Sequence, residues 1–308
     1  MLTLSLSGGL YSLDGHAIAQ QCSSLISGSD LAETSAVSSV LDEVYKLLPN
    51  TQYDNQRAIA FASIAIRFGK TPREVKEVLD GFIKINSNLS YLGDDAFALT
   101  LFAVRSNRTP QEVLAVMSSF YKIDSNLERM WKESIALTAI AVESGKDASQ
   151  VMELMGQFRK LSSNLGYQWD ESLALTSIAA RSEKAPSEVV AILRDVMGMD
   201  SNLDWKEALP MTAIAVQTGK SAKEVWQMAQ QFYKIDSIWS YLSIETIGMS
   251  SIAIHASKTP AEVLAVYQNT FRSFQDLPRN KRIAITALIL SPKNVDLDFF
   301  GYSMRLFR

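Results

Sequence analysis

Cysteine is almost absent from this sequence: its 308 residues include only Cys22, together with two histidines, His16 and His255. A lone cysteine cannot close a disulfide within the chain, which favours a reducing compartment, and so few thiols and imidazoles argue against Cys/His metal sites. The N-terminal segment lacks the basic start of a secretory signal, and no apolar run approaches the roughly 20 residues that span a bilayer. We therefore expect a soluble, cytoplasmic protein with no membrane partner.

An excess of either charge is also missing. The 33 acidic residues nearly balance the 30 basic ones, giving a formal net charge of −3, so no global field attracts nucleic acid. The sequence contains no G-x-x-x-x-G-K-[ST], H-E-x-x-H or G-x-S-x-G motif. We expect no catalytic residues, no metal and no cofactor. An inward-facing α/α toroidal enzyme is the enzymatic alternative, although its hairpins are usually longer.

The sequence contains a repeated segment. The stretch KTPREVKEVLDGFIKINSNL (70–89) returns as RTPQEVLAVMSSFYKIDSNL (108–127). A fixed period of this length is typical of repeat proteins. The valine of this stretch recurs every 38 residues, with one step of 36, at Val37, Val75, Val113, Val151, Val189, Val225 and Val263.

Each repeat predicts two helices. The second opens with sequences such as T-P-R-E, which place a capping hydroxyl, a proline and an acid in the first turn, and its apolar residues follow a 3.6-residue period. Asn88 and its equivalents suit a left-handed residue at its end. The first helix, as in SIALTAIAV (134–142), is apolar or small on nearly every side and must be covered on most of them. Pairs such as Gly145-Lys146 predict its end.

We therefore predict an all-α protein, a right-handed α-solenoid of about seven two-helix repeats of 38 residues with a C-terminal cap. By architecture alone it resembles the α-solenoids of the HEAT, armadillo and tetratricopeptide class. The predicted single domain, 1–308, divides into a degenerate repeat 16–53, repeats 54–91, 92–129, 130–167, 168–203, 204–241 and 242–278, and a cap 279–308.

One line along the first helix is expected to face away from its neighbours. Its middle is small in nearly every repeat and its ends are polar, which suggests a groove that admits a peptide or partner helix. The alternative is that small residues only let adjacent helices pack closely. The candidate partner-binding residues are the polar ends of this line: Gln56, Arg67, Asp94, Arg105, Lys132, Glu143, Asp170, Arg181, Lys206, Gln217 and His255.

Two further columns of similar residues run along the repeats. Trp131, Trp169 and Trp205 begin three successive first helices and are candidate aromatic anchors, or else cover the loops between repeats. A basic column can form a phosphate track, or can simply complement the dipole at a helix C-terminus. It consists of Lys46, Lys84, Lys122, Lys160, Lys234 and Arg272.

These features favour a non-enzymatic scaffold or adaptor that holds another protein or peptide along its inner groove. The alternative is a nucleic-acid-binding helical-repeat protein that uses the basic and aromatic columns. The apolar C-terminal segment DFFGYSMRLFR (298–308) can cap the last repeat or allow self-association.

Overall fold

The computed structural model of the chain describes residues 39–40, 42–48, 58, 61–62, 64–65, 68–90, 93–161, 169–239, 243–273 and 279–290. Helices dominate these ranges, and no strand occurs within them. The twelve α-helices bounded there are α4 (Pro72–Ile85), α5 (Gly93–Ser106), α6 (Pro110–Ile123), α7 (Trp131–Ser144), α8 (Ala148–Leu161), α9 (Trp169–Ser182), α10 (Pro186–Met197), α11 (Trp205–Thr218), α12 (Ala222–Ile235), α13 (Ile244–Ala256), α14 (Pro260–Ser273) and α15 (Arg279–Leu290). Two short 3₁₀ helices, η2 (Ser87–Ser90) and η3 (Ser125–Glu128), follow α4 and α6.

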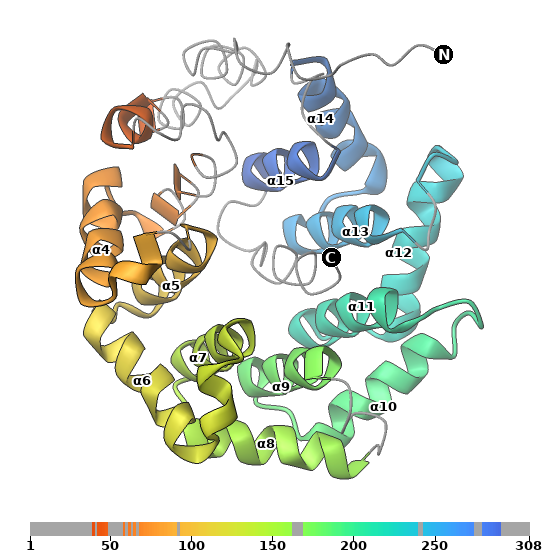
Figure 1. Cartoon of the computed structure of the whole chain (residues 1–308). Coiled ribbons are helices and arrows are strands. Elements are labelled where there is room, and N and C mark those ends of the chain that lie inside the picture. Colours follow the sequence, from red (N-terminus) through yellow and green to blue (C-terminus); the bar gives the residue numbers. More distant parts are fainter. Residues whose placement is uncertain are drawn as a thin grey trace, which may run out of the picture.

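The helices form two curved layers. In one layer α5, α7, α9, α11, α13 and α15 contact each other in turn, and in the other α4, α6, α8, α10, α12 and α14 do the same. The array bends round on itself, with the odd-numbered helices on the inside and the even-numbered helices on the outside (Figure 1). The all-α class and the packing of helix pairs in sequence order are thus confirmed. We call the two layers the inner and outer helices.

The repeated valines lie in the hydrophobic core. Val75, Val113, Val151, Val189, Val225 and Val263 lie on successive outer helices, and all are fully buried. A phenylalanine seven residues later, two turns further along the same face, is fully buried in four of these helices: Phe82, Phe120, Phe158 and Phe232. Equivalent residues therefore occupy equivalent places in successive hairpins, as the spacing predicts.

The capping chemistry follows the sequence at most helix ends. At the start of α4 the Glu74 backbone N–H donates to the Thr71 hydroxyl, and the Thr71 N–H donates to the Glu74 carboxylate at 2.7 Å. Gly145 ends α7 in the left-handed conformation, with φ of +69°. Gly69 and Gly219 have the same conformation, and Asn107, Glu183 and Ser257 adopt it in the other repeats.

The prediction of a left-handed residue at Asn88 is wrong. Asn88 lies within η2, and the residue that ends α4 is Asn86, whose backbone is extended, with φ of −132°. The Asn86 side chain accepts a hydrogen bond from the Asn88 N–H at 3.1 Å, forming an Asx turn. This turn directs the chain so that Leu89 is fully buried.

A column of buried hydroxyls runs through the inner helices and is not evident from the apolar pattern. Each hydroxyl donates to the carbonyl oxygen four residues earlier in its own helix, so no buried donor lacks an acceptor within this column. Its members are Thr100, Thr138, Thr176, Thr212, Ser250 and Thr286, all fully buried.

Two glycines within outer helices allow a direct test of the contact between hairpins. A Cβ at Gly81 of α4 would lie 2.9 Å from Cγ of Pro110 in α6, whereas a Cβ at Gly156 of α8 would meet nothing within 4 Å. Gly156→Ala should raise the free energy of unfolding by about 0.5–1 kcal/mol, since glycine weakens a helix. Gly81→Ala should instead lower it by about 1 kcal/mol, because overpacking exceeds that gain. Urea unfolding of both variants measures the difference. Equal stabilisation by both changes would contradict the close approach of α4 and α6.

Candidate functional site

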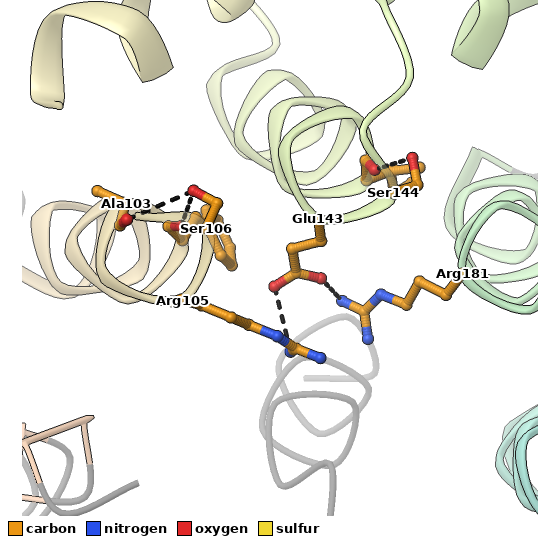
Figure 2. A network of polar contacts seen from close by, with 8 residues as sticks. Ala103, Arg105, Ser106, Glu143, Ser144 and Arg181 are labelled. Atoms are coloured by element: carbon orange, nitrogen blue, oxygen red, sulfur yellow. Dashed lines mark hydrogen bonds and ion pairs between the residues drawn. The ribbon is translucent and has the colours of Figure 1, made fainter. Parts of the chain in front are cut away.

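Three charged side chains from successive inner helices meet on the inside of the curve (Figure 2). Arg105 of α5 donates from Nη1 to Glu143 Oε1 of α7 at 3.3 Å, and Arg181 of α9 pairs through Nη2 with Glu143 Oε2. These residues occupy one predicted line and are 38 residues apart in sequence. The structure therefore brings together three of the predicted partner-binding residues, which we call the inner network.

Burial decides the electrostatics of the inner network. The Glu143 side chain is only 2% exposed, while those of Arg181 and Arg105 are 16% and 31% exposed. A carboxylate removed from water in this way needs positive partners, and two guanidinium groups supply them. Ser106 and Ser144, which lie beside the network in Figure 2, donate to carbonyl oxygens of their own helices instead.

The same line continues past the inner network with different side chains. Gln217 at the end of α11 is exposed and His255 at the end of α13 is half-buried. Gln56 and Arg67, which precede Arg105 on the predicted line, lie outside the described residues. The identity of the polar group thus changes from one inner helix to the next.

The opposite ends of the inner helices carry the remaining candidates. Lys132 and Lys206 are exposed and Asp170 is half-buried, while the side chain of Asp94 lies outside the described part. Burial raises the pKa of Asp170, and the nearby carboxylates of Glu171 and Glu133 raise it further, against the opposing effect of Lys132. The structure does not join these residues to the inner network.

The small residues between the two ends are mostly buried. Ala136, Ala139, Ala174 and Ala213 are all buried, and only Ala98, Leu101 and Ser177 are half-buried among the described ones. Adjacent inner helices contact each other in sequence order. This burial fits the close-packing alternative for the small residues, so a partner on the inner surface would meet polar ends rather than an open apolar floor.

The three tryptophans are engaged in contacts between helices. Trp131, Trp169 and Trp205 are each half-buried against the hydrophobic core at the first residue of an inner helix. The Trp131 Nε1–H donates to Asp95 Oδ2 on the preceding inner helix at 3.0 Å. The guanidinium of Arg159 lies 4.3 Å from the ring centre of Trp169. These contacts favour a role in covering the core over a role as aromatic anchors.

The basic column lies at the last turns of the outer helices, as its sequence position predicts. Its exposed members in the described chain are Lys46, Lys84, Lys122, Lys160 and Lys234, while the side chain of Arg272 lies outside that part. No group of three or more potential metal ligands gathers among the described residues. None of the helices in these ranges is both long and apolar enough to cross a bilayer.

Comparison with known proteins adds no family. Neither a protein-family model nor a curated protein matches this chain.

Two carboxylates, Asp204 and Glu207, lie together at the start of α11. Asp204 caps the helix by accepting from the Lys206 N–H at 2.7 Å, and Glu207 accepts from the Asp204 N–H at 3.3 Å. Burial, together with the hydrogen bond and charge of Asp204, raises the pKa of Glu207 to about 7, while the hydrogen bond from Glu207 lowers the pKa of Asp204. An aspartate at the cap, three residues before a glutamate, is the sequence signal for this pair.

Glu207→Gln tests the carboxylate pair. Since the pKa of Glu207 in the folded chain is about 7, above its ordinary value of 4.5, the folded chain keeps a proton that the unfolded chain releases. Through this group the free energy of unfolding falls as pH rises from about 4.5 to about 7. Glu207→Gln should therefore match the wild type at the acidic end of this range. Above about pH 7, the free energy of unfolding of the variant should exceed that of the wild type by about 1 kcal/mol. This figure allows for solvent screening, because Glu207 is partly exposed. Denaturant unfolding over a pH series measures the difference.

Glu224→Gln is the matched control, because Glu224 has the same place in the capping box of α12, where the cap residue is Ser221 instead of an aspartate. Hydrogen bonds from the Ser221 backbone and hydroxyl lower the pKa of Glu224. Its contribution to stability is present above the ordinary pKa and is lost as pH falls, so Glu224→Gln should destabilise the chain at neutral pH. The same sign of effect in both variants would contradict the assignment.

Glu143→Gln tests the inner network. It keeps the shape of the side chain but leaves two partly buried arginines facing a neutral group. We expect a loss of about 2 kcal/mol in the free energy of unfolding, below the range for fully buried pairs because both arginines are partly exposed. Asp80→Asn, in the exposed Lys76–Asp80 pair of α4, should cost less than about 1 kcal/mol. Similar losses in the two variants, measured by thermal and urea unfolding, would show that the network is not structural.

Proposed function

We propose that this chain is a non-enzymatic protein-binding scaffold that holds a peptide or partner helix against its inner surface. In this proposal the chain is a right-handed α-solenoid of about seven two-helix repeats with a C-terminal cap, forms one domain and acts in the cytoplasm. The supporting observation is the inner network, in which polar groups from three consecutive inner helices converge inside the curve.

The charge of the inner network suggests the chemistry of the partner. Both arginines of the inner network pair with Glu143, and the Arg105 side chain stays 31% exposed on the inside of the curve. The planar guanidinium matches carboxylate geometry better than an ammonium does. An acidic side chain of a bound segment is therefore the expected neighbour of Arg105, the more exposed of the two arginines.

The line beyond the network suggests how the segment is selected. Equivalent positions in neighbouring hairpins present Arg181, Gln217 and His255 in order, so a segment that runs across the inner helices meets a different polar group at each one. Curved helical arrays use such extended concave surfaces for binding.

The alternative is that the basic column binds nucleic acid. Exposed lysines at equivalent helix ends favour it, whereas Asp124 and Asp236, two residues after Lys122 and Lys234, oppose it. The two functions differ in salt response, because phosphate binding weakens log-linearly and steeply with salt concentration.

A charge-swapped inner network is the sharpest test of the scaffold. The triple variant Arg105→Glu, Glu143→Arg, Arg181→Glu exchanges the charge of all three side chains, so an acidic segment meets two carboxylates in place of two guanidinium groups. Peptides are first selected from a random library on the wild-type chain and are expected to share acidic residues. Once circular dichroism shows that the triple variant has the helical content of the wild type, it should bind those peptides at least about tenfold more weakly, a loss of about 1.4 kcal/mol.

The control is the single variant Lys122→Gln, on the basic column and away from the inner surface, which should bind the selected peptides as the wild type does. Unchanged affinity in the triple variant would remove the inner network from the site. Tight binding of a labelled single-stranded RNA that falls steeply with salt and depends on Lys122 would favour the alternative.

A further inference from the structure

The last described inner helix, α15, is in register with the other inner helices. Its Thr286 belongs to the column of buried hydroxyls, as Thr176 of α9 does. Five residues after the hydroxyl, α9 carries Arg181 of the inner network, and the same step from Thr286 leads to Ser291, directly after α15. The sequence therefore leaves α15 at the same end of the inner layer at which the inner network lies.

The sequence that follows α15 carries both carboxylates and large apolar residues. Residues 291–308, which we call the C-terminal segment, lie outside the described residues. Its two carboxylates are Asp296 and Asp298, and its basic residues, Lys293, Arg305 and Arg308, stand nearer to its two ends. Between them are Val295, Leu297, Phe299, Phe300, Tyr302 and Met304. Large apolar side chains left in water forgo roughly 1.5–3 kcal/mol each, so a surface that also pairs the carboxylates would hold this segment.

The inner network lies within reach of the C-terminal segment. Equivalent end residues of neighbouring inner helices pair directly in the network, so the ends of these helices lie side by side. Three contacts, α15 to α13, α13 to α11 and α11 to α9, each span about 8–10 Å, so the ends of α15 and α9 are at most about 30 Å apart. Asp298 follows Leu290 by eight residues and reaches up to about 26 Å from it at roughly 3.3 Å per residue. The long arginine side chain bridges the remainder.

The inner network offers donors that suit both carboxylates. The Arg105 and Arg181 side chains are 31% and 16% exposed and meet Glu143 on the inside of the curve (Figure 2). A guanidinium has five N–H donors in a planar fork, so one arginine can bind two carboxylates at once. Leu101, one turn before Arg105 on α5, is half-buried and offers an apolar contact beside the network.

The covalent link favours this segment over other occupants. A segment tethered by a few residues is present at an effective concentration of about a millimolar. An acidic segment of another protein, or the same segment of a second copy, has no such advantage at ordinary protein concentrations.

We propose that the C-terminal segment crosses the inner surface and sets Asp296 and Asp298 against the guanidinium groups of the inner network. The segment is then an internal ligand that any partner on this surface must displace. Its docking does not require the scaffold function, whereas its competition with a partner rests on that proposed function.

Chymotryptic cleavage of the full chain after Phe299, Phe300 or Tyr302 measures the docking, because a protease cuts the undocked form. In the wild type this cleavage should be at least about tenfold slower than in a synthetic peptide of residues 291–308. The segment variant Asp296→Lys, Asp298→Lys should be cut as fast as a peptide with the same substitutions. Its circular dichroism should match that of the wild type.

Restoration of charge pairing tests the register of the docked segment. The triple variant Arg105→Glu, Glu143→Arg, Arg181→Glu should also be cut at the rate of the peptide, because its carboxylates face those of the segment. Combined with the segment variant, it should return to within about threefold of the wild-type rate, since the lysines then face carboxylates. The matched control is Lys122→Glu at the exposed end of α6, which should be cut as the wild type is.

The acidic peptides selected on the wild-type chain separate this inference from the scaffold function. If both hold, the segment variant should bind them at least about tenfold more tightly than the wild type, because nothing competes. Restored cleavage protection without any peptide binding would keep the docking and remove the scaffold function. Peptide binding by a wild type whose segment is cut as fast as the free peptide would do the reverse.

Three results would overturn the proposal. The first is a wild-type segment that is cut at the rate of the free peptide. The second is protection that survives both the segment variant and the triple variant, which would place the segment elsewhere, for example as a cap on the last repeat. The third is protection that disappears on dilution, which would place the segment on a second copy of the chain.

Discussion

The fold depends on the burial of one hairpin's apolar face against the next. A hairpin of about 38 residues has a backbone ordering cost of roughly 1–2 kcal/mol per residue, which its own few core side chains cannot offset at 1.5–3 kcal/mol each. The fully buried column from Val75 to Val263 is where neighbours supply the difference. Because this packing repeats, residues 36 or 38 apart become neighbours in space, as in the inner network and the Trp131–Asp95 contact.

Much of this architecture can be predicted from the sequence, because local rules act at each helix end. The T-P-x-E motif predicts a capped helix start and the Gly-Lys pair predicts a left-handed helix end. The capping box at Thr71 and the left-handed Gly145 agree with these rules. Asn88 could not be predicted in the same way, since asparagine suits both a left-handed cap and an Asx turn. The choice depends on whether Leu89 must reach the core, which is a tertiary constraint. The buried hydroxyl of Thr138 is similar: its sequence neighbours show an apolar helix but not which face lies deepest.

For the candidate site, the sequence identifies the column but not the contacts within it. Helical periodicity places Arg105, Glu143 and Arg181 on one line, whereas ion pairing also depends on the distance between neighbouring inner helices and on burial. The same limit applies to Trp131, whose partner Asp95 is set by how closely α5 and α7 approach. In the middle of the line the sequence leaves two interpretations open, because its alanines suit both an exposed groove and close packing between inner helices. The structure buries most of these alanines.

Burial also explains why one column alternates in charge and another does not. Identical repeats stack identical charges, and at 4 Å with an effective dielectric of 20 two like charges repel by roughly 4 kcal/mol. The buried column avoids this by alternating Arg105, Glu143 and Arg181. At the exposed ends of the outer helices, like charges in water repel each other much less than buried charges do, so Lys84, Lys122 and Lys160 can recur unchanged. The alternation of charge in this column therefore lets the array remove the Glu143 carboxylate from water beside positive partners.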